Sequence, residues 1–457
     1  MKSSDRTLLW AVLALAATLR LLIFLAACQH PERTLTPDSH SYLQAAWQWL
    51  ATGQYPPTAY RTPVYPLFLA FIFGVAGPSL QAVVAMQSLL GVLNVWLAWE
   101  LGRRLLTPQA AIAGAMLFAI SPEGFASGFY ILTETLFTSL LLTSLLFLIK
   151  ACQTGAKSSF AISAALMATA ALCRPIALLL PVCIVGILFA APNLRWFEAI
   201  KRSLIYALVF AAVLAPWVFR NWTSLGAPVF STTGSDLLLR YHSAALIASR
   251  QGVAEAQARA ELESRVRESL AREKLPDTEI NRARVQSRLA LQILGRHPLE
   301  YTALHLKRCL NNFLPYLAPL FEITGQTTGG RGTLSVLNNQ GLKAAIRHYF
   351  GDKTWLIGIA GPLLILLAAI YMAAAVSVVN LARHKAWFVL AVLLLPTLFL
   401  LLLPGSASEP RFRLPIMPLL CLLAAPSILN VWNTITLKNS APSQPEKVQV
   451  ENRNFGN

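Results

Sequence analysis

Charged side chains are scarce in this sequence. Asp, Glu, Lys and Arg make up 13% of its 457 residues, whereas they make up about a quarter of a soluble domain. Hydrophobic residues reach 55%, so an ordinary soluble fold is excluded. Acidic residues are scarcer than basic ones, 21 against 38, and the net charge is +17. The basic residues lie at the ends of apolar runs and in one long loop, without interleaved aromatics. Membrane lipid phosphates are therefore expected as partners, and nucleic acid is not.

Cysteine and the common catalytic motifs are also poorly represented. The six cysteines are scattered, mostly within apolar runs and without C-x-x-C spacing, so neither a disulfide framework nor a metal site is indicated. The sequence contains no H-E-x-x-H, no Walker motif and no G-x-S-x-G with triad partners. Because nothing points to ATP, an enzyme facing outward would need a substrate that is already activated.

Long apolar runs are what the sequence does contain. A helix needs about 20 apolar residues to cross a bilayer, and about ten such runs are present. The sequence predicts an all-α polytopic membrane protein. "LAAC" at 25–28 resembles a lipoprotein cleavage box, but its apolar run is long and contains Arg20, so we expect an uncleaved first span. The runs begin near Thr7, Leu80, Ala110, Ile131, Ser158, Ile176, Ser203, Thr354, Ala386 and Leu414.

Basic residues between the runs predict the topology, because short loops rich in Lys and Arg stay in the cytoplasm. With Lys2 and Arg6 inside, alternation places the other basic turns inside as well. Both termini are then cytoplasmic. The outer segments are 29–79, 121–130, 220–353 and 404–413, and Arg174 lies at a further outer turn.

This topology divides the chain into four parts. Residues 1–219 form an N-terminal membrane module that includes the first outer loop, 29–79. Residues 220–353 form a larger, mostly helical outer loop, and 354–437 form the C-terminal spans. The polar stretch 438–457, with Pro, Ser and alternating charges, is expected to be a disordered tail.

The unexplained polar residues gather on the outer face. Asp38 precedes "SYLQAAWQWLATGQYP", in which apolar residues at helical spacing and two tryptophans predict a short helix at the headgroup layer. That helix would hold Asp38 close to lipid headgroups. In the alternative interpretation, Asp38 only caps the helix.

Several basic residues of the outer segments could hold a phosphate. Arg61 in "YRTPVYPLFLA" lies beside two tyrosines, and a guanidinium matches phosphate geometry well. Arg174 in "LCRPIALLLP", and Arg411 with Arg413 in "EPRFRLPIMP", occupy similar positions. The alternative for each of them is an interfacial anchor that extends to water.

Two acids occur in "SPEGFASGFYILTETLF". Glu123 lies in the turn, and Glu134 lies about one turn inside the next span, where an ionisable group is costly and suggests function. We expect a cationic partner such as Arg20, and a purely structural Arg20–Glu134 pair remains open.

The long outer loop contains two basic amphipathic patterns. Val285, Leu289 and Ile293 repeat every four residues, and a second pattern runs from Tyr301 to Leu310. Helices of this kind favour an anionic membrane surface, which is the interpretation preferred for both.

Taken in order, these motifs resemble the bacterial GT-C glycosyltransferases. The resemblance is carried by the first-loop Asp, "SYLQAAWQWLATGQYP", "YRTPVYPLFLA", "ELGRRL", "ISPEGFASGFYILTETLF", the outer "RP" turn, "GRHPLEYTALHLKRCLNNFL" and "EPRFRLPIMPLL". Within these, the sequence is most similar to the branch of protein mannosyltransferases, aminoarabinose transferases and rhizobial galacturonosyltransferases. The similarity covers most of the chain, although each motif alone is degenerate.

The resemblance implies a GT-C-type bundle of about ten membrane helices with a juxtamembrane first loop. It also implies transfer of a sugar, with inversion, from a polyprenyl-phosphate carrier. By position, Asp38 would be the catalytic base, and Arg61, Glu134, Arg411 and Arg413 would match substrate-binding residues. Tyr65, Arg174 and His40 are further substrate-binding candidates.

One departure from the family concerns metal. Many relatives have paired acids in the first loop, whereas here Asp38 is followed by Ser39 and His40. A divalent metal is therefore only a possibility, and no cofactor is predicted with certainty.

The expected acceptor is an envelope glycolipid, a glycan or a protein, on the outer face of the bacterial plasma membrane. Two alternatives stay open. A lipid or sugar transporter would require pseudo-symmetric halves or a water-filled midplane cavity. A structural subunit would carry a dead site.

Overall fold

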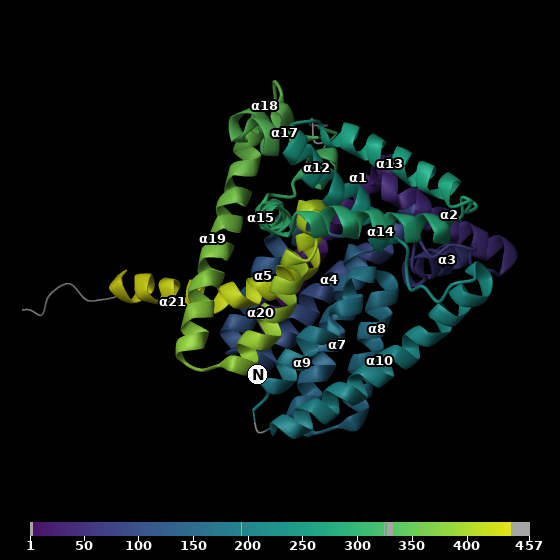
Figure 1. Ribbon diagram of the computed structural model, residues 1–457. Helices are drawn as coiled ribbons and strands as arrows, with labels where there is room; N and C mark the ends of the chain where they lie inside the picture. The colour runs from purple at the N-terminus through teal and green to yellow at the C-terminus, as the bar shows by residue number, and fades with distance from the viewer. Residues whose placement is uncertain (1–2, 193, 324, 327–331, 354, 440–457) are drawn as a thin grey trace, which may run out of the picture.

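The protein is an assembly of helices, seen in the computed structural model of Figure 1. The description covers residues 3–439 except 193, 324, 327–331 and 354. Within that part every regular element is a helix, so the predicted all-α fold class is confirmed. The expected tail lies almost wholly outside the described residues.

Among the described residues, six helices are long and apolar enough to cross a membrane. The other expected spans correspond to shorter apolar helices, so the exact number of crossings stays a prediction. The long helices are α1 (Ser3–Gln29), α4 (Leu80–Leu105), α7 (Glu134–Thr154), α10 (Trp196–Leu225), α19 (Leu356–Arg383) and α21 (Met417–Asn439), and the shorter ones are α5 (Pro108–Ile120), α8 (Lys157–Cys173), α9 (Pro181–Phe189) and α20 (Trp387–Leu402).

Small residues allow the central helices to pack closely. Gly102 on α4 and Gly114 on α5 both face Leu422 on α21, and a methyl group at either glycine would overlap the leucine side chain. Close backbone approach of this kind is the usual basis of helix packing in lipid. Helices α4, α7 and α21 are mostly buried, whereas α1, α10 and α19 leave most of their apolar surface exposed.

The first outer loop folds as a helical hairpin at one edge of the bundle. Helix α2 (Pro37–Thr52) packs on α3 (Val64–Ala76), with the rings of Trp47 and Phe73 stacked 4.5 Å apart. Trp47 and Trp49 keep exposed faces. The short tryptophan-bearing helix predicted from the sequence is present, separate from the long helices (Figure 1).

The long outer loop forms a lobe with a core of its own, which includes Leu262, Val266, Val285 and Ala290. Its elements are α11 (Thr233–Leu237), the π-helix η3 (Leu238–Ser243), α12 (Ala244–Gln251), α13 (Glu255–Arg272), α14 (Glu279–Arg296) and α15 (Pro298–Cys309).

The lobe changes the interpretation of the amphipathic patterns. The apolar face of α14 is covered by this core, so the expectation that it lies on a membrane surface is wrong. Helix α15 differs, because Leu299 and Leu306 on it, and Leu310 directly after it, are exposed. For α15 the membrane-surface position stays a prediction. The remaining short helices are η1 (Pro31–Thr34), α6 (Pro122–Ala126), η2 (Pro175–Leu179), η4 (Leu310–Phe313), α16 (Ala318–Ile323), α17 (Thr333–Gln340), α18 (Leu342–Phe350), η5 (Gly405–Ala407) and η6 (Pro410–Ile416).

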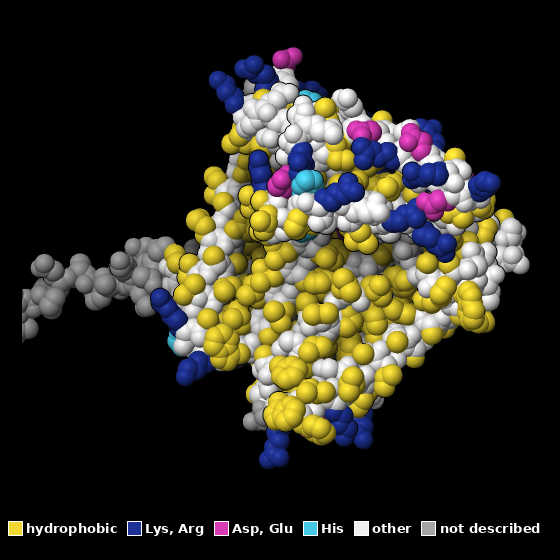
Figure 2. Space-filling model, in the orientation of Figure 1, with side chains coloured by type: hydrophobic (Ala, Val, Ile, Leu, Met, Phe, Trp, Pro, Cys, Tyr) yellow, Lys and Arg dark blue, Asp and Glu magenta, His cyan; other side chains and the backbone are white. Residues whose placement is uncertain are grey.

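Charge divides the surface into zones. Figure 2 shows a hydrophobic middle, a lobe bearing both signs of charge, and a lower end where Lys and Arg appear without acids. Figure 1 places the N-terminus at that lower end, opposite the lobe. The molecule is a multi-pass membrane protein with a polar lobe on one side.

We predict that the lobe loses stability in acid through His242. Its Nδ1 lies 3.0 Å from Tyr301 Oη and its ring stacks on His305 at 5.6 Å. Burial, with the nearby His305, lowers the pKa of His242 to about 4. A histidine in the unfolded chain titrates near 6.5, so between pH 6.5 and 4 the proton binds the unfolded state more tightly than the folded one. The lobe therefore has its full stability above pH 6.5 and loses stability as the pH falls toward 4. By pH 4 the loss is about 3 kcal/mol.

Hydrogen exchange of lobe amides across this pH range would measure the effect. His242→Gln should flatten the pH dependence, whereas His40→Gln, at an exposed histidine, should not. An unchanged slope in the His242 variant would contradict the prediction.

Candidate functional site

Asp38 lies in the first turn of α2 but does not cap it. The cap is Thr36, whose backbone N–H donates to Ser39 Oγ over 2.9 Å, in a capping box. Ser39 Oγ also donates to the Ile131 carbonyl over 2.9 Å, which ties the start of α2 to the segment before α7. The interpretation of Asp38 as a cap is therefore wrong, and its carboxylate is available for other contacts.

Asp38 is bound by two arginines from distant parts of the chain. Its Oδ1 accepts from Arg61 Nη2 at 2.8 Å, and its Oδ2 accepts from Arg411 Nη2 at 2.7 Å. The Asp38 side chain is 37% exposed, against 15% and 18% for the two arginines. The two ion pairs are therefore open to solvent mainly at the Asp38 carboxylate, which we call the open edge of the pairs.

Arg61 is held on several sides. Its Nε donates to Ser41 Oγ at 2.8 Å and its Nη1 to Tyr42 Oη at 3.1 Å. The guanidinium lies 4.4 Å from the ring centre of Tyr42 and 4.9 Å from that of Tyr60, distances at which cation–π attraction is effective. Arg61 is thus fixed in one orientation.

The lobe holds the loop that carries Arg61. Glu279 at the start of α14 accepts from the Ala59 backbone N–H at 2.9 Å and from Thr232 Oγ1 at 2.7 Å. Arg220 at the end of α10 donates to the carbonyls of Tyr55 and Thr58 at 2.9 and 3.1 Å. Lobe and site are therefore mechanically connected.

A second ion pair joins Glu134 to Arg174 over 2.7 Å. The expected Arg20–Glu134 pair is wrong. Arg20 instead donates to the carbonyls of Ala16 and Gly124 at 3.1 and 2.5 Å. It fits against α4 only because Gly91 has no side chain there.

The final outer turn links the two ion pairs. Arg411 Nε lies 2.7 Å from Glu409 Oε2, and Arg411 also interacts electrostatically with Glu134. The guanidiniums of Arg174 and Arg411 each lie 5.3 Å from the ring centre of Phe412. The arginine–carboxylate cluster, as we call it, consists of Asp38, Arg61, Glu134, Arg174, Glu409 and Arg411.

The charges of this cluster balance, and its arginines control the protonation of Asp38. Burial raises the pKa of Asp38, but the Arg411 and Arg61 guanidiniums more than offset this, so its pKa lies below the ordinary value. The carboxylate is therefore ionised at neutral pH, and it can accept a proton readily only if a cation moves away.

Other predicted residues lie outside the cluster. Arg413 pairs with Glu123, and both side chains are fully buried. Tyr65 is buried and donates to Gln87 Oε1 at 2.8 Å, with its ring against that of Tyr42. His40 is exposed. Arg413 thus binds a carboxylate where a phosphate was expected, and Tyr65 supports Tyr42.

Sequence reasoning did not single out Glu409, Ser41, Tyr42 or Phe412 as site residues. Tyr42 lies one helical turn after Asp38, so helical spacing could have found it. Glu409 stood next to the proposed arginines in the sequence. For metal, among residues 3–439 with the gaps given above, no group of three or more His, Cys, Asp or Glu could hold an ion.

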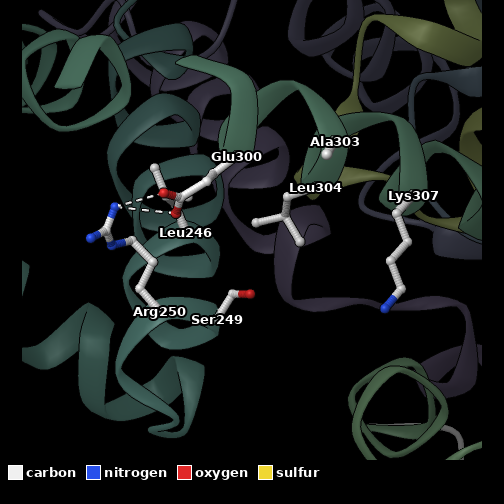
Figure 3. A pocket seen from close by; sticks show the side chains of 7 residues that line it. All are labelled: Leu246, Ser249, Arg250, Glu300, Ala303, Leu304 and Lys307. Carbon is white, nitrogen blue, oxygen red and sulfur yellow. Dashed lines mark hydrogen bonds and ion pairs between the residues drawn. The ribbon is translucent and has the colours of Figure 1, made fainter. Parts of the chain in front are cut away.

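A separate open pocket of about 540 Å³ lies on the lobe between α12 and α15. Figure 3 shows Arg250 paired with Glu300. Lys307 lies on the other side of the pocket from Ser249. No member of the arginine–carboxylate cluster lines it, so no part of the site is assigned to it.

We predict that Glu123→Gln destabilises the protein by about 3–5 kcal/mol, because it leaves Arg413 buried without a counter-charge. Thermal unfolding of the purified protein in detergent would measure the loss. Glu32→Gln, at an exposed acid, is the matched control. Equal stability of the two variants would contradict a structural role for the pair.

Comparisons with known proteins can be set against this geometry. A family model described as dolichyl-phosphate-mannose-protein mannosyltransferase matches residues 60–219. That range contains Arg61, Glu134 and Arg174, and Asp38 and Arg411 lie outside it. No curated protein sequence matches the chain significantly.

Solved structures resemble the whole chain. The oligosaccharyltransferase AglB from Archaeoglobus fulgidus, in complex with an inhibitory peptide and a dolichol-phosphate, has 13% identity, a TM-score of 0.53, and coverage of 97% of this chain and 53% of that one. An Archaeoglobus fulgidus oligosaccharyltransferase tethered to an acceptor peptide has 11% identity, a TM-score of 0.51, and coverage of 96% and 51%. ArnT from Cupriavidus metallidurans, bound to undecaprenyl phosphate, has 14% identity, a TM-score of 0.41, and coverage of 94% and 80%.

The chain spans about half the length of the archaeal structures that it matches. The predicted resemblance to GT-C glycosyltransferases is confirmed: the chain has the fold of the archaeal oligosaccharyltransferase, and its residues 60–219 match the protein mannosyltransferase family model.

Proposed function

We propose that this protein is a membrane glycosyltransferase that transfers a sugar from a polyprenyl-phosphate carrier to an acceptor outside the cytoplasm. The observation that carries the proposal is the placement of Asp38 between Arg61 and Arg411 at an open edge. The family match, and the dolichol-phosphate in the archaeal relative, support a lipid-phosphate donor.

The reaction follows from the chemistry of the donor. The acceptor hydroxyl oxygen attacks the anomeric carbon, and the bond from that carbon to the phosphate oxygen breaks. The proton of the hydroxyl passes to Asp38 as general base. The bond electrons leave with the lipid phosphate. A single displacement of this kind inverts the anomeric configuration.

Arginines stabilise the departing phosphate. It leaves with one more negative charge than it carried in the donor, and cations already in place lower the energy of that charge in a water-poor site. Arg411 and Arg174, whose guanidiniums both lie 5.3 Å from the ring centre of Phe412, are placed for this role, and Arg61 adds positive charge nearby. Glu134 fixes Arg174. No step requires a metal.

The membrane position of the site suits such a donor. A polyprenyl tail stays in the bilayer, so its phosphate meets the enzyme at the headgroup layer. The basic end of the molecule lies opposite the lobe (Figure 2). We propose that this end faces the cytoplasm with both termini, and that the site faces outward from a bacterial plasma membrane. The acceptor is an envelope glycolipid, a glycan or a protein.

We predict that Asp38→Asn lowers sugar transfer by about 10²–10⁴-fold, because asparagine cannot take the proton. Mass spectrometry of envelope glycolipids in a gene-deleted strain, complemented with each variant, gives the readout. Glu32→Gln is the control at an exposed acid of the same loop. If the protein were a transporter without catalytic activity, the Asp38→Asn strain and the wild-type strain would contain the same modified glycolipids. Transfer by Asp38→Asn at the wild-type level would remove the proposed base.

A further inference from the structure

The proposed base is bound by one of the arginines that we propose to bind the donor phosphate. Asp38 Oδ2 accepts from Arg411 at 2.7 Å, while its Oδ1 accepts from Arg61 at 2.8 Å. A carboxylate that pairs with two guanidiniums binds a proton weakly. The arrangement that neutralises Asp38 therefore also opposes its use as a base.

The two arginines differ in how firmly they are held. Arg61 donates to Ser41 and Tyr42 besides Asp38, and it lies against two tyrosine rings. These contacts would all have to break for it to turn. Arg61 is therefore the fixed partner of Asp38.

Arg411 is shared between two carboxylates. Its Nη2 binds Asp38, and its Nε lies 2.7 Å from Glu409 Oε2. This Nε contact lacks hydrogen-bond geometry, so a buried N–H on Arg411 remains without an acceptor. A buried donor without an acceptor costs free energy, and a phosphate oxygen would supply one. Glu409 would keep the side chain in place during the exchange.

We propose that Arg411 exchanges Asp38 for the donor phosphate while Arg61 remains on Asp38, so that donor binding releases the base. This inference rests on the proposed function. One phosphodiester anion replaces one carboxylate beside Arg411, so the charge next to that arginine is unchanged. Asp38 keeps a single cation, Arg61, and becomes basic enough to accept the acceptor's proton when the donor is present.

The exchange makes Asp38 a competitor of the donor phosphate. Asp38→Asn should therefore bind undecaprenyl phosphate about fivefold more tightly than the wild type, although it cannot catalyse transfer. Binding is measured on the purified full chain in lipid nanodiscs. Uncharged undecaprenol is the ligand control and should bind both proteins equally, and Glu32→Gln should bind like the wild type.

The two arginines supply a second, independent comparison. Arg411→Gln should weaken undecaprenyl phosphate binding about tenfold, because it removes a charged donor to the phosphate. Arg61→Gln should weaken it by less than roughly threefold. Because Arg61→Gln removes a cation from Asp38, it should also move the acid limb of the pH profile of transfer to higher pH, and Arg61→Lys should restore it. Size-exclusion profiles and thermal unfolding identify any variant that fails to fold.

The outcomes separate the two proposals. If the wild type binds undecaprenyl phosphate no better than undecaprenol, the proposed function fails. If the wild type prefers the phosphate, but Asp38→Asn binds it equally or more weakly, the exchange is wrong and the donor site stands. Equal losses for Arg61→Gln and Arg411→Gln would also overturn the exchange.

Discussion

This structure depends on one constraint: each guanidinium or carboxylate of the arginine–carboxylate cluster that is removed from water needs an opposite charge beside it. A guanidinium or carboxylate removed from water is costly unless an opposite charge lies against it. In a chain with only 13% charged residues, the structure meets this requirement by bringing α2, the loop after it, α7 and the final outer turn to one place. The arginine–carboxylate cluster therefore specifies how these distant segments meet, whatever chemistry it performs.

The same requirement explains why the lobe and the first loop interlock. The loop between α2 and α3 has little regular structure, and by itself would leave Arg61 poorly placed. Glu279 and Arg220 bind its backbone from outside. The lobe thus acts on the arginine–carboxylate cluster without contributing a residue to it, which gives a physical reason for so large a loop.

Sequence reasoning reached the fold and part of the site for a definable reason. Hydropathy and charge report which residues face lipid, water or one side of the membrane, and this information sufficed to find Asp38, Arg61 and Arg411. It does not report the rotation of a helix about its axis. Rotation decides that Arg20 meets Gly124 and not Glu134, and that Glu123 meets Arg413. The partners of buried charges were therefore the least predictable feature.

Two ion pairs of the same residue types differ in whether a ligand can reach them. Arg413 lies two residues after Arg411 in the chain, yet Arg413 and its partner Glu123 are both closed to solvent. A ligand could reach them only by unfolding their surroundings. Asp38 and Arg411 meet at an edge where the carboxylate is partly open. The proposed exchange needs such an edge, because an incoming anion must reach one partner while the other is held. Exposure, more than residue type, is therefore what makes the Asp38–Arg411 pair the candidate for chemistry and the Glu123–Arg413 pair a support of the fold.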